Sequence, residues 1–225
     1  MVPFHTDAVQ VVGKLKIDSL EGVDTLAMSG HKFNGPKGVG ALYVRSGMRM
    51  QPLLRGGGQE REMRSGTENV PAIIGMGVAA EEAWERLEAD PEQLKVAEVR
   101  DTFEARVLQL VSGVTVNGAP DCRLPSHTHL SFESCEAAGL VILLDEMGVQ
   151  CSAGSACMTG KQEPSHVQMA MGLSREHAKS SLRFSFSHEN TLEEAELAAE
   201  AVQKAVEKLR KVQSRGIGPV VVYTP

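Results

Sequence analysis

The chain has 225 residues, 42% of them hydrophobic and 23% charged, which is typical of a globular protein with one large domain or two smaller ones. Its net charge is −6 and no basic block precedes the last helix, so nothing suggests a nucleic-acid partner. No apolar run approaches the roughly 20 residues that span a bilayer, and the first residues lack a secretory signal, so we expect a cytoplasmic protein without a membrane partner.

Residues 1–46 alternate between short apolar runs and turn signals, a pattern typical of α/β structure. The apolar runs predict strands at residues 2–6, 25–29 and 40–44. The turn signals between them are Gly13, Gly22 and the glycine- and proline-containing stretch at residues 35–38.

Lys32 is a candidate nucleophile. It follows an apolar run and precedes a glycine-rich turn, so it can end a buried strand with its amine in a cleft. Such a lysine can carry pyridoxal phosphate as a Schiff base, and the coenzyme also needs an acid for its ring nitrogen and donors for its phosphate. Asp7 can supply the acid, and Ser29 and His31 can donate to phosphate oxygens. A lone lysine is usually a surface residue, so the hypothesis depends on Lys32 occurring together with an acid and two phosphate donors.

Residues 51–68 are polar and rich in glycine, which is typical of a long surface loop. Apolar residues then recur at helical spacing over residues 70–88, and the helix is expected to stop near Asp90 and Pro91. We place a domain boundary there. The predicted parts are residues 1–90, residues 91–215 and a tail at 216–225.

The second part reads as an α+β layer, with helices mixed with a small sheet. The expected helices are at about residues 92–110 and 137–147, and the strands are at 114–116, 128–132 and 182–187. A capping box from Thr191 to Glu194 opens a last long helix that runs to about residue 212.

The four cysteines are predicted to be thiols, because the chain lacks a secretion signal. Cys157 lies among small residues flanked by glycines, a stretch that can move, as a sulfur carrier must. The alternative is a buried small hydrophobic side chain. Cys151 is either a core thiol or a resolving partner of Cys157, and Cys122 and Cys135 are predicted to be structural. The spacing of Cys151, Cys157 and His166 matches no common zinc pattern, so we expect no metal.

Arg183 alternates with apolar residues in a strand-like segment. Its planar guanidinium can bind a substrate carboxylate, and the alternative is an exposed arginine in a salt bridge. His166 follows a proline-led helix start and is predicted to be structural.

Several motifs occur in the order found in cysteine desulfurases, and the chain most resembles the nitrogen-fixation type. These enzymes belong to the class V aminotransferases, which use pyridoxal phosphate on an α/β fold of type I. The similar motifs lie at residues 5–10, 29–32, 53–57, 64–69, 155–157, 163–167 and 181–185. The resemblance implies that residues 1–90 are the C-terminal part of the large coenzyme domain and that the rest is the small α+β domain.

The resemblance also implies roles for individual residues. Lys32 would carry the coenzyme and move the α-proton of L-cysteine, while Asp7 pairs with the ring nitrogen and Gln10 bonds the ring oxygen. Arg183 would bind the substrate carboxylate, and Cys157 would take the sulfur as a persulfide for an acceptor or iron-sulfur scaffold protein. The loop threonine, Thr67, would reach the phosphate held by the neighbouring subunit, which implies a homodimer.

The family's N-terminal elements, which include a glycine-rich phosphate loop and a residue stacked on the ring, are not found in this sequence. We therefore expect the chain to be the C-terminal part of a longer enzyme. Two alternatives remain: a truncated, non-catalytic remnant that serves as a dimerisation or scaffold-binding module, and a selenocysteine lyase, which shares these motifs.

Overall fold

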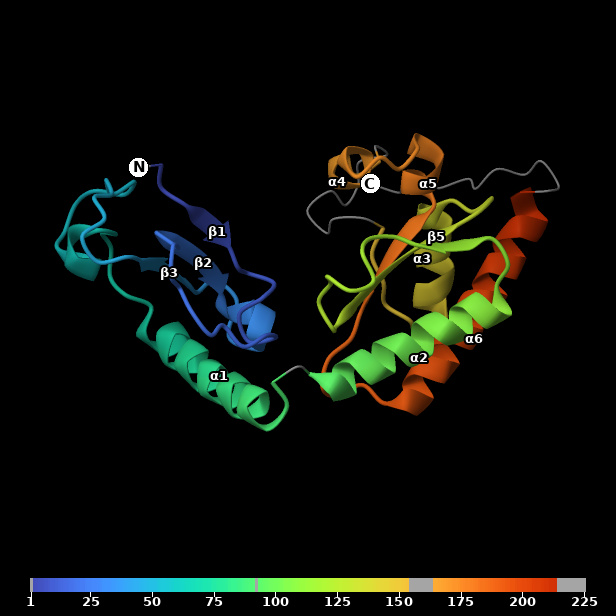
Figure 1. Cartoon of the computed structure of the whole chain (residues 1–225), viewed down its shortest axis with the longest axis horizontal. Coiled ribbons are helices and arrows are strands. Elements are labelled where there is room, and N and C mark those ends of the chain that lie inside the picture. The colour runs from blue at the N-terminus through green and yellow to red at the C-terminus, as the bar shows by residue number, and fades with distance from the viewer. Residues whose placement is uncertain (1, 92, 154–163, 214–225) are drawn as a thin grey trace. The chain divides into compact units, whose positions relative to one another are not determined.

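The computed structural model describes residues 2–91, 93–153 and 164–213, coloured in Figure 1. The chain separates into two compact units, Met1–Gln93 and Leu94–Pro225. The predicted boundary between residues 90 and 91 lies close to this division. Each unit is described by itself. None of the helices in the described ranges is long and apolar enough to cross a membrane.

The first unit contains a three-stranded sheet in the order β1-β2-β3, formed by β1 (His5–Asp7), β2 (Thr25–Ser29) and β3 (Gly40–Val44). β1 runs parallel to β2, whereas β3 is antiparallel to it. The predicted bounds of β2 and β3 are confirmed. The first strand begins later than the predicted residues 2–6, because Pro3 has no N–H and the Phe4 N–H donates to the Asp24 carboxylate at 2.7 Å.

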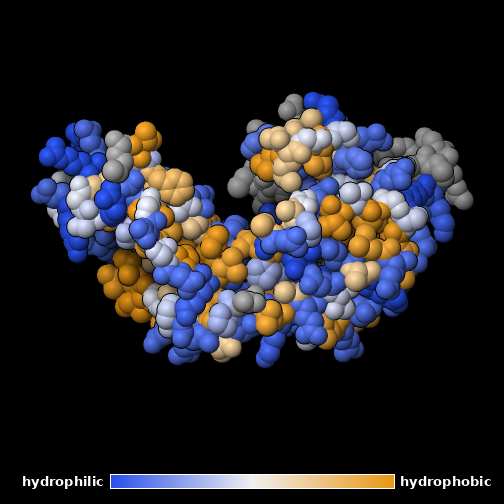
Figure 2. All heavy atoms as spheres, viewed as in Figure 1, coloured by the Kyte–Doolittle hydropathy of each residue, from blue (hydrophilic) through white to orange (hydrophobic). Residues whose placement is uncertain are grey.

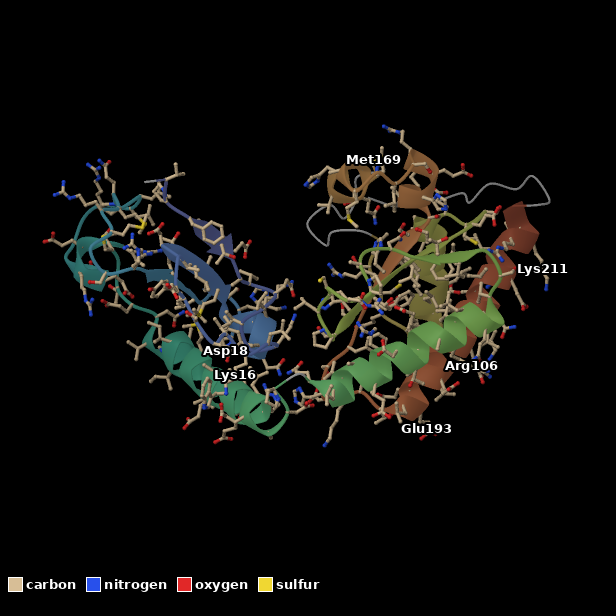
Figure 3. The ribbon with its side chains drawn as sticks, viewed as in Figure 1. Lys16, Asp18, Arg106, Met169, Glu193 and Lys211 are labelled. Atoms are coloured by element: carbon tan, nitrogen blue, oxygen red, sulfur yellow. The ribbon has the colours of Figure 1, made fainter. Side chains whose placement is uncertain are left out.

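The helix α1 (Val70–Ala89) follows the predicted apolar period and buries alanine and leucine on one face. Asn69 caps its start by accepting a hydrogen bond from the Ala72 N–H at 3.3 Å, and the helix ends before Pro91 as predicted. Lys16, labelled in Figure 3, pairs with Glu88 near the end of α1 at 2.8 Å. The remaining elements of the unit are two 3₁₀ turns, η1 (Gly30–Phe33) and η2 (Gln59–Glu62), of which η2 interrupts the loop predicted at 51–68.

The second unit is built on an antiparallel sheet in the order β4-β5-β6. Its strands are β4 (Val114–Val116), β5 (His127–Phe132) and β6 (Ser181–Ser185), and its longer helices are α2 (Leu94–Leu110), α3 (Ala137–Glu146) and α6 (Leu192–Gln213). All six correspond to predicted elements, with ends that differ by a few residues. β5 is the central strand, so its side chains face both surfaces of the sheet.

The helices α2, α3 and α6 pack with the sheet around one apolar core, and α2 and α6 lie side by side in Figure 1. Fully buried side chains from all these elements meet there, including Phe103, Val107, Leu130, Phe132, Leu140, Leu144, Leu182, Val202 and Val206. The ring of Phe103 lies 4.7 Å from that of Phe184, centre to centre. Arg106 of α2, labelled in Figure 3, pairs with Glu196 of α6 at 3.0 Å.

The predicted capping box of α6 is confirmed. The Glu194 N–H donates to Thr191 Oγ1 at 3.2 Å, and the Thr191 N–H donates to Glu194 Oε2 at 2.9 Å. Two short helices, α4 (His166–Ala170) and α5 (Arg175–Lys179), lie between the last two strands in sequence. Only the start of α4 was indicated by the sequence, since each helix has just five residues and shows no apolar period.

Candidate functional site

In the first unit, the candidate coenzyme residues meet at one edge of the sheet. Asp7 is the last residue of β1 and Ser29 is the last residue of β2, and the two strands are parallel, with Asp7 opposite Ala27. The carboxyl ends of parallel strands lie at the same edge, which is where α/β proteins commonly bind ligands. Lys32 lies in η1, immediately after β2.

The turn that carries Lys32 is tightly closed. Asn34 adopts a left-handed conformation with φ of 72°, and its N–H donates to the Gly30 carbonyl, as does the N–H of Gly35 at 2.8 Å. A Cβ at position 35 would lie 2.9 Å from the same carbonyl oxygen, so the turn requires glycine there. Phe33 is buried beneath the turn and fixes the backbone next to Lys32.

Ser29 and His31 are within hydrogen-bond distance of each other, with 2.9 Å between Ser29 Oγ and His31 Nδ1. Asp7 is exposed, and its Oδ1 accepts a hydrogen bond from the Val9 N–H at 3.0 Å. Lys32 is half-buried, and its amine makes no hydrogen bond or ion pair with any residue in the described ranges. The edge therefore presents a carboxylate, two polar donors and an available amine.

These groups fit the needs of pyridoxal phosphate. The carboxylate of Asp7 can pair with a protonated ring nitrogen, Ser29 and His31 can donate to the phosphate, and Lys32 can hold the aldehyde carbon. The two other residues predicted to bind the coenzyme are Gln10 and Thr67. Gln10 Oε1 accepts from Lys14 Nζ at 2.7 Å, and Thr67 is exposed just before α1, without a hydrogen bond to any of the four residues at the edge.

In the second unit, Arg183 lines a pocket of about 230 Å³. Arg183 lies in the middle of β6, directly opposite His129 of β5, and its Nε is buried without a hydrogen-bond partner among the described residues. Both polar and apolar side chains line this pocket. The other lining residues are Asn117, His129, Ser165, Val167, Gln168, Met171 and Leu173. The cavity and the free guanidinium N–H fit the predicted carboxylate site better than the salt-bridge alternative.

Sequence reasoning missed three polar residues of this pocket. His129 Nδ1 lies 2.9 Å from Asn117 Nδ2, and His129 Nε2 lies 2.6 Å from Gln168 Nε2. Burial, followed by the charge of Arg183, lowers the pKa of His129, so the ring is neutral at pH 7. The available signal was the alternation of β5, which places His129 on the same face of the sheet as Arg183.

The sulfur-accepting residue proposed from the sequence, Cys157, lies outside the described residues. Among the described cysteines, Cys135 is buried, Cys122 is exposed and Cys151 is half-buried. Burial, reinforced by the charge of Asp145, raises the pKa of Cys151 to about 11, so Cys151 is a protonated core thiol at pH 7. Within residues 2–91, 93–153 and 164–213, no group of three metal-ligating side chains is brought together.

Known proteins are similar to this chain in both sequence and fold. The class V aminotransferase family model matches residues 2–197. A cysteine desulfurase of Gluconacetobacter diazotrophicus is 45% identical over 93% of this chain and 52% of its own length. The cysteine desulfurase NifS of Azotobacter vinelandii is 46% identical over 97% of this chain and 55% of its own length. The X-ray structure of a NifS-like protein from Rickettsia africae superposes with a TM-score of 0.81 and 32% identity, covering 91% of this chain and 54% of that one.

The chain thus spans about half the length of the relatives that it matches. The family match nevertheless extends through both units, from the strand that carries Asp7 to the beginning of α6. It includes the predicted coenzyme edge and the Arg183 pocket, and the fold of the relatives is the predicted fold type I of coenzyme-dependent aminotransferases. The chain belongs to the class V aminotransferase family, whose cysteine desulfurase members depend on pyridoxal phosphate.

Proposed function

We propose that the protein to which this chain belongs is a cysteine desulfurase, which converts L-cysteine to L-alanine and retains the sulfur. The observation that carries the proposal is the edge formed by Asp7, Ser29, His31 and Lys32, where an acid, two donors and an available amine occur in the first unit. The relatives named above are desulfurases, and none of their names indicates a selenocysteine lyase or a non-catalytic module.

When bound, pyridoxal phosphate withdraws electrons from the substrate's α-carbon. Lys32 anchors the coenzyme and then moves the α-proton, and its half-buried position limits access of water to the amine. Asp7 keeps the ring nitrogen protonated, and Gln10 donates to the ring oxygen through its NH₂ group, since the hydrogen bond from Lys14 goes to Gln10 Oε1. Arg183 binds the substrate carboxylate through its guanidinium group, which lines the pocket.

Sulfur transfer is assigned to Cys157. Its thiolate attacks the sulfur of the substrate, the substrate's Cβ–S bond breaks with its electron pair left on carbon, and that carbon takes a proton to give alanine. The products are alanine and a persulfide on Cys157. Cys151 is a poor substitute, because a thiol with a pKa of about 11 holds very little thiolate at pH 7.

The sulfur acceptor, the oligomeric state and the cellular location are also part of the proposal. The persulfide would supply a sulfur-acceptor or scaffold protein for iron-sulfur cluster assembly. A homodimer would bring Thr67 to the phosphate bound by the partner subunit, which is consistent with the exposure of Thr67. A cytoplasmic location without nucleic-acid or membrane partners is also part of the proposal, and the net charge of −6 gives no electrostatic reason to expect nucleic acid.

The test compares two lysine variants of the complete protein. Lys32→Ala should abolish alanine release from L-cysteine and the adduct that borohydride fixes on the protein, because Lys32 supplies the amine that directly follows β2 at this edge. Lys37→Ala is the matched control: Lys37 is exposed in the following turn and its loss should leave both readouts unchanged. A borohydride-fixed adduct that survives in Lys32→Ala would disprove the assignment. L-selenocysteine assayed in parallel tests the selenocysteine lyase alternative.

A further inference from the structure

The pocket beside Arg183 contains two buried polar atoms that lack partners among the described residues. One is Arg183 Nε, and the other is the amide oxygen position of Gln168, a residue only 6% exposed. Both residues line the same cavity. An unpartnered polar atom is costly to bury, so two of them at one cavity indicate that a ligand completes their hydrogen bonds.

The hydrogen-bond network fixes the proton on His129. Asn117 Nδ2 lies 2.7 Å from Ser131 Oγ and 2.9 Å from His129 Nδ1, so its two hydrogens are donated to these acceptors. His129 is neutral, because burial and then the charge of Arg183 lower its pKa. Since Nδ1 accepts, the single proton lies on Nε2, which is 2.6 Å from the terminal amide of Gln168.

This proton determines which way the amide of Gln168 points. A ring N–H requires an acceptor, so the oxygen of Gln168 must face His129 Nε2 and the NH₂ group must occupy the unpartnered position in the pocket. The reverse arrangement would place an amide oxygen against any anion drawn in by Arg183. Anion binding therefore favours the arrangement in which Gln168 donates.

The pocket is then suited to an organic carboxylate. Two N–H donors, from Arg183 and Gln168, can each bond one carboxylate oxygen, and Val167, Met171 and Leu173 supply an apolar wall for the carbon chain. Gln168 comes from α4, whose position is marked by Met169 in Figure 3, while Arg183 comes from β6. The site depends on a short helix packed near the sheet.

We propose that Gln168 is a second carboxylate-binding residue beside Arg183, and that His129 is a positioning residue that holds the Gln168 amide in its donating orientation. The proposal rests on the proposed function for the identity of the natural ligand, L-cysteine. The carboxylate site itself can be tested without any turnover.

The test uses the isotope-labelled 225-residue chain, with sodium propionate as the probe and propionamide as its uncharged counterpart. Propionate should shift the NMR signals of Arg183 Nε–H and the Gln168 NH₂ saturably, whereas propionamide should not. Gln168→Met keeps the volume and removes the donor, so propionate should bind about tenfold more weakly. Met169→Leu, on the same helix but not lining the pocket, is the control and should bind propionate as the wild type does.

A second variant and a second readout keep the test decisive. Gln168→Glu preserves the shape and should abolish propionate binding through charge repulsion, which answers the question if Gln168→Met does not fold. Nitrogen shifts of the bound chain should show His129 protonated at Nε2 and bare at Nδ1, which a purely structural histidine would not require.

Unchanged propionate affinity in both Gln168 variants, an Nδ1-protonated His129 or no saturable binding to the wild type would each overturn the proposal. Failure of the proposed function would look different: the complete enzyme would release no alanine, while propionate would still bind as described.

Discussion

The two units differ in how they bury apolar surface. The second unit has one core in which many large or medium apolar side chains from its helices and sheet are fully or almost fully buried, including Phe103 and Leu130. The buried apolar side chains of the first unit are mostly alanines, with Leu26, Phe33 and Leu87 as the larger ones. Figure 2 shows apolar surface among the polar side chains of the first unit.

The comparison shows where the hydrophobic stabilisation of the described chain lies. Burial of large side chains contributes about 1.5–3 kcal/mol each, so the second unit holds most of the hydrophobic stabilisation of the described chain. Both units expose some large apolar side chains, such as Leu53 in the first, at 95%, and Leu197 in the second, at 60%, but the first has fewer large buried ones to offset them. We therefore expect the first unit to be the less stable of the two when the chain is studied alone.

The largest expected effect follows from removing the centre of the second core. Phe103 has no exposed surface and contacts the rings of Phe184 and Phe186, so Phe103→Ala should lower the free energy of unfolding of this unit by about 3–5 kcal/mol. Hydrogen exchange, read separately for the two units, measures it. Amides of α2, β5 and α6 should lose protection, while those of the first unit keep theirs.

Equal loss of protection in both units would show that they unfold together and would break the comparison. The matched substitution in the first unit is Phe33→Ala, at a ring that is 4% exposed. It should reduce protection around η1 and α1 and leave β5 unchanged.

A glycine pair tests how closely the first unit is packed. Gly13 and Gly22 have the same φ of 78°, but a Cβ at Gly13 would collide with the Cβ of Phe33, whereas one at Gly22 meets nothing within 4 Å. Gly22→Ala therefore adds only backbone strain, about 1 kcal/mol, and Gly13→Ala adds steric overlap for a total of about 2–3 kcal/mol. Urea unfolding followed at Trp84, on α1, compares them. Identical midpoints would mean that the turn moves away from Phe33 without cost.

Local patterns predicted most of the regular structure. The bounds of β2, β3 and β4 and the start of α1 coincide with those predicted, because alternation, helical period and capping residues are set by neighbours in sequence. The capping box at Thr191 is likewise set by residues close together in sequence. The short helices α4 and α5 were missed or only partly indicated, since five residues carry no period.

The site was only partly predictable, for a physical reason. Lys32, Ser29 and His31 are neighbours in sequence, so a motif can reveal them. Asp7 and Arg183 were candidates from their own strand-like segments, and the resemblance implied the same roles. The group formed by Asn117, His129 and Gln168 comes together only through the pairing of β4 with β5 and the position of α4. No spacing along the chain encodes that contact.

A smaller effect is expected at the cap of α6. Thr191→Ala removes the hydroxyl that accepts from the Glu194 N–H, and should cost about 1 kcal/mol in the second unit. Thr191→Ser retains the hydroxyl and should restore the stability, as measured by thermal unfolding of both variants. Since the cap lies at the surface, the first unit should be unaffected, and a change in its hydrogen exchange would contradict the independence of the two units.

The smallest effect concerns the pH dependence of the second unit. The pKa of His129 is lowered below its ordinary value of 6.5, first by burial and then by the charge of Arg183, so the unfolded chain takes up a proton at a pH where the folded unit does not. The contribution of His129 to stability is therefore fully present above pH 6.5 and is lost as the pH falls from there towards the lower folded pKa. Urea midpoints measured from pH 8 to pH 5 should fall more steeply for the wild type than for His129→Gln, which cannot titrate. A variant that follows the wild-type curve would show that groups other than His129 control the acid side of the profile and that His129 is not buried as a neutral ring.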